Sequence, residues 1–230
     1  MGSLDRSDSG RRRRGPGRPR AADQNGPGTA DRLLEVATRL FAAKGYDGVG
    51  MREIADEVGV NVATVQHHAG SKADLYAAVF RRVHDRERAA LAAAAAAHSP
   101  PGDLDRAGVV TGLHDLLDAY LDFLESVPET TPLWLRRWLA PESHSELDDE
   151  FALPLYRLVE EFLADAAARG LVDEPDPHVA VRSVVWAAHG YLTARAARPD
   201  LAEQERDAFR AYAHRWIEAL YGGGPPRRGR

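Results

Sequence analysis

Apolar side chains recur at three- and four-residue intervals along most of the chain, and glycine or proline interrupts the pattern. This spacing puts the apolar residues on one stripe of an α-helix, whereas a half-buried strand requires strict alternation. Gly45, Gly59 and Gly170 each follow such a stretch, at the point where a left-handed residue commonly ends a helix. The pattern therefore predicts an all-α fold.

Capping residues divide the chain into about nine helices. Asn61 and Ser71 are good N-caps, and Asp176 precedes a proline at the first helical position. Pro154 falls inside one stretch, so we expect a late start or a kink there. The expected helices cover 30–44 (after an N-cap at Thr29), 51–58, 62–68, 72 into the alanine run 89–97, 103 or 105 to 127, 131–139, 148–169, 177–197 and 201–221.

The net charge of −5 is distributed unevenly. Residues 1–28 contain seven Arg and three Asp with one large aliphatic residue, which predicts a disordered Arg-rich tail. Residues 29–77, the expected three-helix head, carry five basic and seven acidic side chains. The expected body, 78–221, is acidic, and 222–230 resemble the first tail. A basic end on an acidic body is typical of a protein that contacts nucleic acid.

Several function classes are disfavoured. The absence of cysteine excludes disulfides, iron–sulfur clusters and thiol catalysis. The alanine run is too short and weakly apolar to span a bilayer, and no apolar segment follows the basic N-terminus as in a secretory signal. The sequence contains no nucleotide-binding glycine loop, no HExxH and no Gly-x-Ser-x-Gly. We therefore expect a cytoplasmic protein without membrane contact that is neither an enzyme nor a cofactor or metal carrier.

Residues 50–69 have the spacing of a helix-turn-helix motif. Such a motif needs a small residue where the helices cross, a turn residue that tolerates positive φ, and an apolar anchor on the second helix. Ala55, Gly59 and Val65 meet these needs at the right separations. An arbitrary helical hairpin would explain the apolar pattern, but not the joint placement of these three residues.

Residues 29–80 resemble the N-terminal domain of the TetR-like family of transcriptional regulators. The matching stretches are TADRLLEVATRLFAAKGYDG, MREIADEVGV and TVQHHAGSKADLYAAV. The resemblance implies a homodimer that binds double-stranded DNA, most often as a repressor, and whose C-terminal bundle binds a small-molecule effector. Gln66 and Ala69 stand where the family usually has aromatic residues, and Val62 where a basic or small polar residue is usual. These departures leave open an alternative, a module that coats DNA or binds protein with little sequence readout.

The second helix of the motif is the expected reading helix. With Val65 inward, Gln66 can make two hydrogen bonds to adenine, and Val62 or Ala63 can contact a thymine methyl. Lys72, at the start of a helix, can meet phosphate. In the tail, Pro16–Arg20 is similar to the core of an AT-hook, which leaves open reading of an A·T-rich minor groove or contact with phosphate alone. The predicted DNA-binding residues are Arg52, Asn61, Val62, Ala63, Thr64, Gln66, His67, Lys72, Arg18 and Arg20.

All four tryptophans lie in the C-terminal block, together with aromatic and polar residues at helical spacing. Such a set is typical of a pocket for an apolar or aromatic effector, although core packing explains any single member. On the short helix at 131–139, we expect Arg136 and Arg137 on the face opposite the tryptophans. Small residues near Ala187 and the final helix near Tyr212 suit a four-helix dimer interface. The predicted effector residues are His114, Tyr120, Phe123, Trp134, Trp138, Trp186 and His189.

Overall fold

The computed structural model describes residues 27–97, 101–140, 143–198, 200 and 202–223. Nine α-helices and three short helical turns run through these residues, and none of them forms a strand, so the all-α prediction is confirmed. The helices are α1 (Pro27–Lys44), α2 (Met51–Val58), α3 (Val62–Ala69), α4 (Lys72–Ala95), α5 (Arg106–Ser126), α6 (Thr130–Trp138), α7 (Leu153–Ala168), α8 (Pro177–Ala196) and α9 (Ala202–Ile217). The turns are Pro101–Asp103, Asp148–Ala152 and Glu218–Gly222.

The helices begin and end where the local sequence provides caps. The Asn61 side chain accepts from the Thr64 amide, and Ser71 forms a capping box with Asp74. Gly45, Gly59 and Gly170 have φ of 74°, 82° and 71°, as left-handed helix ends require.

Two predicted starts can be compared with the structure. The expected start of α1 after Thr29 is wrong, because the helix already begins at Pro27, and proline is tolerated in a first helical turn. Pro154 lies in the first turn of α7, just after the π-helical turn Asp148–Ala152, so the late start is confirmed.

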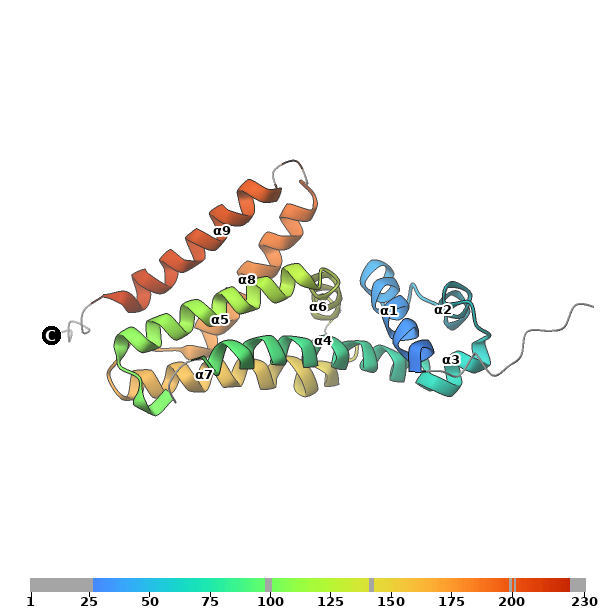
Figure 1. The fold of residues 1–230 in the computed structure, drawn as a ribbon, viewed down its shortest axis with the longest axis horizontal. Coiled ribbons are helices and arrows are strands. Elements are labelled where there is room, and N and C mark those ends of the chain that lie inside the picture. Colours follow the sequence, from blue (N-terminus) through green and yellow to red (C-terminus); the bar gives the residue numbers. More distant parts are fainter. Residues whose placement is uncertain (1–26, 98–100, 141–142, 199, 201, 224–230) are drawn as a thin grey trace, which may run out of the picture.

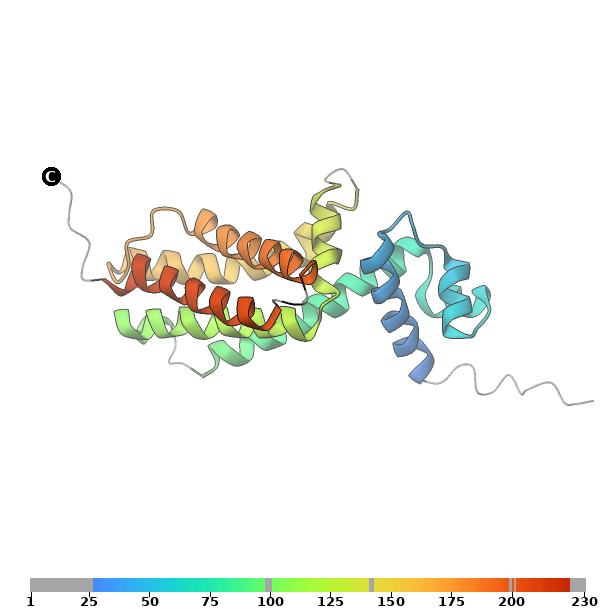
Figure 2. The ribbon, with the colours of Figure 1, turned by 90° about the horizontal axis from the view of Figure 1, so that it is seen from above.

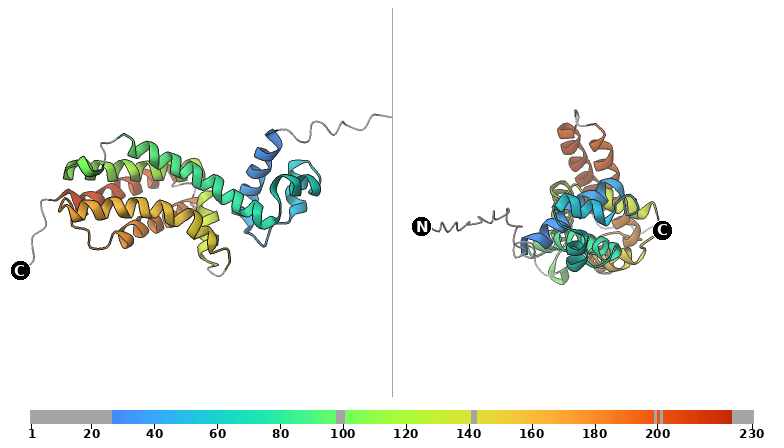
Figure 3. Two further views of the ribbon diagram at one scale, coloured as in Figure 1. Left: turned by 90° about the horizontal axis from the view of Figure 1, so that it is seen from below. Right: turned by 90° about the vertical axis from the view of Figure 1, so that its right-hand side faces the viewer.

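Figure 1 shows a head formed by α1, α2 and α3 at one end of an elongated molecule, with α4 running from it into the body. Seen from above, α5, α7, α8 and α9 follow the long axis, whereas α6 stands across it (Figure 2). In the end-on view of Figure 3, α8 and α9 project from the rest on one side. Within the described residues, no helix combines the length and apolar character needed to cross a bilayer.

The head is joined to the body through α4 and through α6. The Arg136 guanidinium donates to the carbonyl oxygens of Ala42 and Ala43 at 3.0 and 2.6 Å, which satisfies the C-terminal end of α1 from the body. The Phe80 ring of α4 meets Trp134 of α6 edge to face, with centroids 4.8 Å apart. A change at α4 or α6 can therefore reach the head directly.

The expected orientation of Arg137 is wrong. Its side chain is buried rather than on the solvent face of α6, with 4% of its surface exposed. The guanidinium donates to the carboxylate of Asp148 at 2.6 Å, and Asp148 lies in the turn that precedes α7. This ion pair offsets the cost of burying the Arg137 charge. The spacing of residues on α6 alone could not predict it, because Asp148 lies in a different segment.

Candidate DNA-binding surface and interior cavities

The helix-turn-helix motif is held together by its turn and its anchor. The amides of Gly59 and Val60 both donate to the Ala55 carbonyl at 2.9 Å, so the chain leaves α2 in a tight left-handed turn. Val65 of α3 is fully buried in the head. Because Val65 fixes which side of α3 faces inward, the opposite side is presented to solvent.

Ala63, Gln66 and His67 are exposed on α3, as the sequence predicted for a reading face. Val62 is only partly exposed, because it packs against the core of the head. The side-chain Oδ1 of Asn61 accepts from the Thr64 amide at 2.8 Å and from the Thr64 hydroxyl at 3.1 Å. The capping contact leaves the Asn61 amide group as a donor toward a ligand.

The charges of the head are partly neutralised by α2. Glu57 forms an ion pair with Arg39 at 2.6 Å, and Glu53 forms one with Lys44. The hydrogen bond from the Lys44 ammonium lowers the pKa of the Glu53 carboxyl. Arg52 is exposed at the start of α2. These pairs make the surface less attractive to phosphate than five basic residues would suggest.

Lys72 lies at the N-terminal end of α4, where the helix dipole and the ammonium both favour an anion. Its Nζ is 4.3 Å from the centroid of the Tyr46 ring, which restricts the side chain beside α3. The predicted tail residues Arg18 and Arg20 lie outside the described residues.

A cavity of about 600 Å³ lies in the body between α4, α5, α7, α8 and α9. Its walls are mainly leucine, valine and alanine side chains, with the rings of Tyr120, Tyr156 and Trp216. This volume is within the range of natural small-molecule sites. Glu87 of α4 also lines it, with 7% of its surface exposed, and burial raises the pKa of its carboxyl to about 8.

The predicted effector residues are not gathered in one place. Tyr120 lines the large cavity. Trp138 and Trp186 line a second cavity of about 350 Å³, next to Arg137 and Asp148. Phe123 and Trp134 are buried in the core, and His114 lies at the contact between α5 and α9.

His189 lies between the two cavities, with 2% of its surface exposed. Its Nε2 is 3.1 Å from the Tyr120 hydroxyl and its Nδ1 is 3.0 Å from that of Thr131. Trp138 of the second cavity meets the His189 ring edge to face. Burial lowers the pKa of His189 to about 4, so the ring is neutral near pH 7. This side chain physically connects the walls of both cavities.

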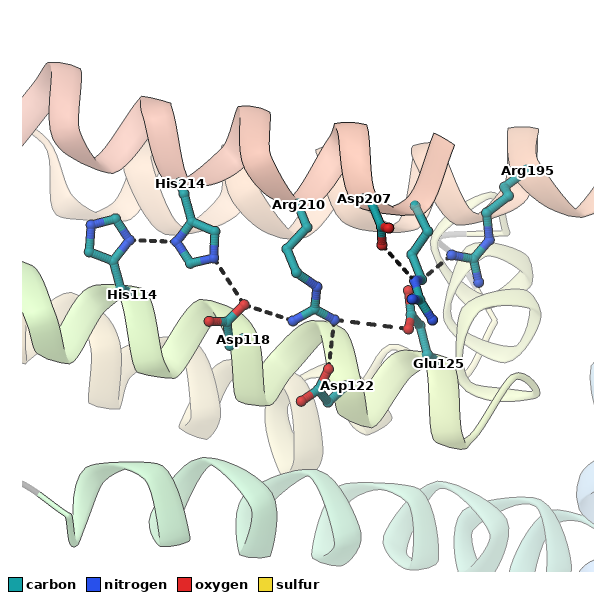
Figure 4. A network of polar contacts seen from close by, with 9 residues as sticks. His114, Asp118, Asp122, Glu125, Arg195, Asp207, Arg210 and His214 are labelled. Atoms are coloured by element: carbon teal, nitrogen blue, oxygen red, sulfur yellow. Dashed lines mark hydrogen bonds and ion pairs between the residues drawn. The ribbon is translucent and has the colours of Figure 1, made fainter. Parts of the chain in front are cut away.

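Polar side chains follow one another along the facing sides of α5 and α9 (Figure 4). His114 Nε2 faces Glu218 at 2.9 Å, His214 Nε2 faces Asp118 at 3.0 Å, and the two Nδ1 atoms are 2.6 Å apart. Arg210 donates to Asp118 at 2.7 Å and continues the row.

Glu87 was not predicted from the sequence, and of this polar row only His114 was, as an effector residue. Glu87 had a visible signal: Phe80, Val83 and Glu87 share one helical stripe, so the carboxyl occupies a position that the pattern assigns to the interior. The polar row had none, because its members are far apart in the chain.

Comparisons with known proteins agree with this architecture. The model of the family described as "Bacterial regulatory proteins, tetR family" matches residues 33–79. The chain is 40% identical to the transcriptional activator FasR of Mycolicibacterium smegmatis over 75 residues, which are 30% of this chain and 34% of that protein. It is 28% identical to the transcriptional regulatory protein RaaS of Mycobacterium tuberculosis over 188 residues, 80% of this chain and 78% of that one.

Two solved structures are similar in fold. The ketosteroid transcriptional regulator KstR2 of Mycobacterium tuberculosis has a TM-score of 0.64 at 18% identity, over 86% of this chain and 97% of that chain. The fatty acid degradation regulator FadR from Bacillus halodurans has a TM-score of 0.63 at 18% identity, over 90% and 99%. The match to FasR spans about a third of that relative's length. Residues 33–79, which contribute to the head, therefore match the tetR family of bacterial regulatory proteins, and the fold of the whole chain is similar to that of solved transcriptional regulators.

Proposed function

We propose that the chain is a homodimeric transcriptional repressor that binds a specific DNA sequence and is released by a small-molecule effector. The observation that carries the proposal is the pairing of an exposed reading face on α3 with a large apolar cavity whose wall includes α4. FasR is named as a transcriptional activator and RaaS as a transcriptional regulatory protein, so both support DNA-binding regulation of transcription in general and neither supports repression in particular. Such a protein acts in the cytoplasm, on the nucleoid.

The reading face has a defined chemistry. Gln66 is exposed and can hydrogen-bond adenine N6 and N7 in the major groove, while the Ala63 methyl suits a thymine methyl. His67, Thr64 and the Asn61 amide group are candidate donors to phosphate. Because Val62 is partly covered, we assign the thymine contact to Ala63 rather than to Val62.

Phosphate contacts fix the register of the head. Lys72 combines its charge with a helix N-terminus, and Arg52 presents a guanidinium from α2. With two head cations engaged by Glu53 and Glu57, the tail arginines Arg18 and Arg20 are left to supply attraction, by phosphate contact or in an A·T-rich minor groove.

A second copy of the chain is the proposed partner of α8 and α9. Trp186 on α8 and Tyr212 on α9 expose about half of their surfaces, which is unusual for side chains this large and apolar. Burying them between two copies would form a four-helix interface. A two-fold dimer would present two α3 helices to successive major grooves, about 34 Å apart.

Footprinting on the DNA beside the protein's own coding region tests the proposal. A discrete palindromic site, whose occupation lowers transcription from a linked reporter, is the expected result. Gln66→Ala should reduce discrimination at one adenine position while binding non-specific DNA unchanged, and exposed Glu161→Gln provides a control far from α3. Smooth coverage without a preferred site would favour the alternative, a DNA-coating module with little sequence readout.

A further inference from the structure

Apart from tyrosines, the ionisable side chains that line the large cavity are all carboxylic acids. Among the described residues that line it, the carboxyl groups are those of Glu87, Glu174 and Asp176, and none of the lining residues is Lys, Arg or His. An anionic ligand, such as a fatty acid, would meet three acids and no counter-ion. A cationic ligand would instead meet groups that can carry the opposite charge.

Two of these acids already have structural partners. Glu174 accepts from the Tyr221 hydroxyl and from the Asp176 amide, the latter at 2.8 Å. Asp176 caps α8 by accepting from the Val179 amide at 3.1 Å. Both lie on the segment that leads into α8, so they close one end of the cavity and need no ligand.

Glu87 differs from both of them. It is more than nine-tenths buried, and burial acts on its carboxyl without a compensating hydrogen bond or ion pair from the described residues. Tyr120 and Tyr156 are close enough that its charge would raise their pKa values further. The carboxyl therefore faces the cavity as a polar group without a partner, beside two phenol rings.

We propose that this cavity binds an apolar molecule carrying a single cationic amine, with the Glu87 carboxylate as its counter-ion. The proposal rests on the proposed function and specifies the effector's chemistry. A protonated amine supplies the charge that the buried carboxyl lacks, and a charge-assisted hydrogen bond in an apolar site is stronger than one in water. Tyr120, Tyr156 and Trp216 add ring faces that attract a cation. The remaining aliphatic walls suit a hydrocarbon body.

The position of Glu87 links such a ligand to the head. Glu87 and Lys72 are on the same helix, fifteen residues or about 22 Å apart. A ligand that attaches α4 to α5, α7 and α8 through Glu87 would act on the element whose first turn is proposed to meet DNA.

Three probes with one tail and different heads provide the test: decylamine, decanol and decanoate, titrated by calorimetry and Trp fluorescence below their micelle concentrations. We expect the amine to bind wild-type protein at least tenfold more tightly than the alcohol, and decanoate to bind most weakly. Glu87→Gln should weaken the amine at least tenfold and leave the alcohol unchanged. Glu161→Gln, the same substitution on the exposed side of α7, is the control.

The proton provides a second readout. Glu87 must lose its proton as the ammonium binds, so calorimetry in buffers of different ionisation enthalpy should detect one proton released near pH 6.5, and none in Glu87→Gln. Equal affinity for the three heads, tightest binding of decanoate, or an unchanged amine affinity in Glu87→Gln would overturn the proposal. DNA binding is measured in parallel: Glu87-dependent amine binding that leaves the DNA complex intact would support the ligand class and contradict effector release.

Discussion

Replacing Glu87 with glutamine should change how stability depends on pH. The carboxyl has an ordinary pKa of 4.5 in the unfolded chain, whereas burial raises its pKa to about 8 in the folded protein. Between these values the unfolded state ionises while the folded state keeps its proton. The contribution of Glu87 to stability is therefore fully present below pH 4.5 and is lost as the pH rises toward 8.

The size of the effect follows from the shift. Each pKa unit corresponds to about 1.4 kcal/mol, so the ligand-free wild type should lose about 3 kcal/mol relative to Glu87→Gln between pH 5 and pH 7. The assay is urea unfolding followed by Trp fluorescence, at pH 5, 6, 7 and 8 and at one protomer concentration, since dimerisation would otherwise shift the midpoint.

The difference between the two proteins isolates this one group from every other titration. An offset that is constant with pH would reflect packing of the glutamine amide and would refute the argument. Glu161→Gln, which removes an exposed carboxylate, should show no pH-dependent difference from wild type. Adding decylamine at pH 7 should raise the wild-type midpoint and leave that of Glu87→Gln nearly unchanged.

Four further changes have defined outcomes. Because burial lowers the pKa of His189 from 6.5 to about 4, stability should fall by about 3 kcal/mol as the pH drops through that window, and unfolding of His189→Gln should lack this dependence. Arg137→Ala leaves Asp148 without its partner and should cost about 3 kcal/mol or more in urea unfolding, while a paired change of Arg137→Met with Asp148→Leu recovers most of it; equal losses in both variants would contradict a specific ion pair. Gln66→Ala should reduce discrimination at one adenine by about 10- to 100-fold in binding competition, and an unaltered preference would remove Gln66 from the reading face. Deleting residues 1–20 should weaken DNA binding and flatten its salt dependence, whereas an unchanged salt slope would exclude the tail from phosphate contact.

The helix boundaries were predictable because caps are local. Ser71 and Asp74 form their reciprocal bonds within four residues, and Gly59 ends α2 through its own φ of 82°. No tertiary information is needed for either. The helix-turn-helix head follows from the same local rules together with one buried anchor, Val65.

The cavities depend on residues that meet only in the folded chain. Arg137 and Asp148 belong to different helical segments, and periodicity on α6 alone gives the guanidinium no reason to face inward. The tryptophans indicated a pocket, but aromatic rings fill cores as readily as they line cavities. Trp134, for example, is buried in the core. A charged residue on an apolar stripe, as at Glu87, is a more specific signal, since burial of a lone carboxyl needs a reason.

The contacts around α4 suggest how an occupied cavity could alter the spacing of the two heads in the proposed dimer. A ligand can shift their separation only if it binds one spacing more tightly than the other. Glu87 fixes the ligand to α4, whereas Arg136 ties the end of α1 to α6. A ligand that moves α4 while α6 holds α1 would therefore act on the head against the Arg136 contact. Arg136→Met should therefore weaken the coupling between amine and DNA without changing the affinity of the amine itself, which separates the transmission of the signal from its reception.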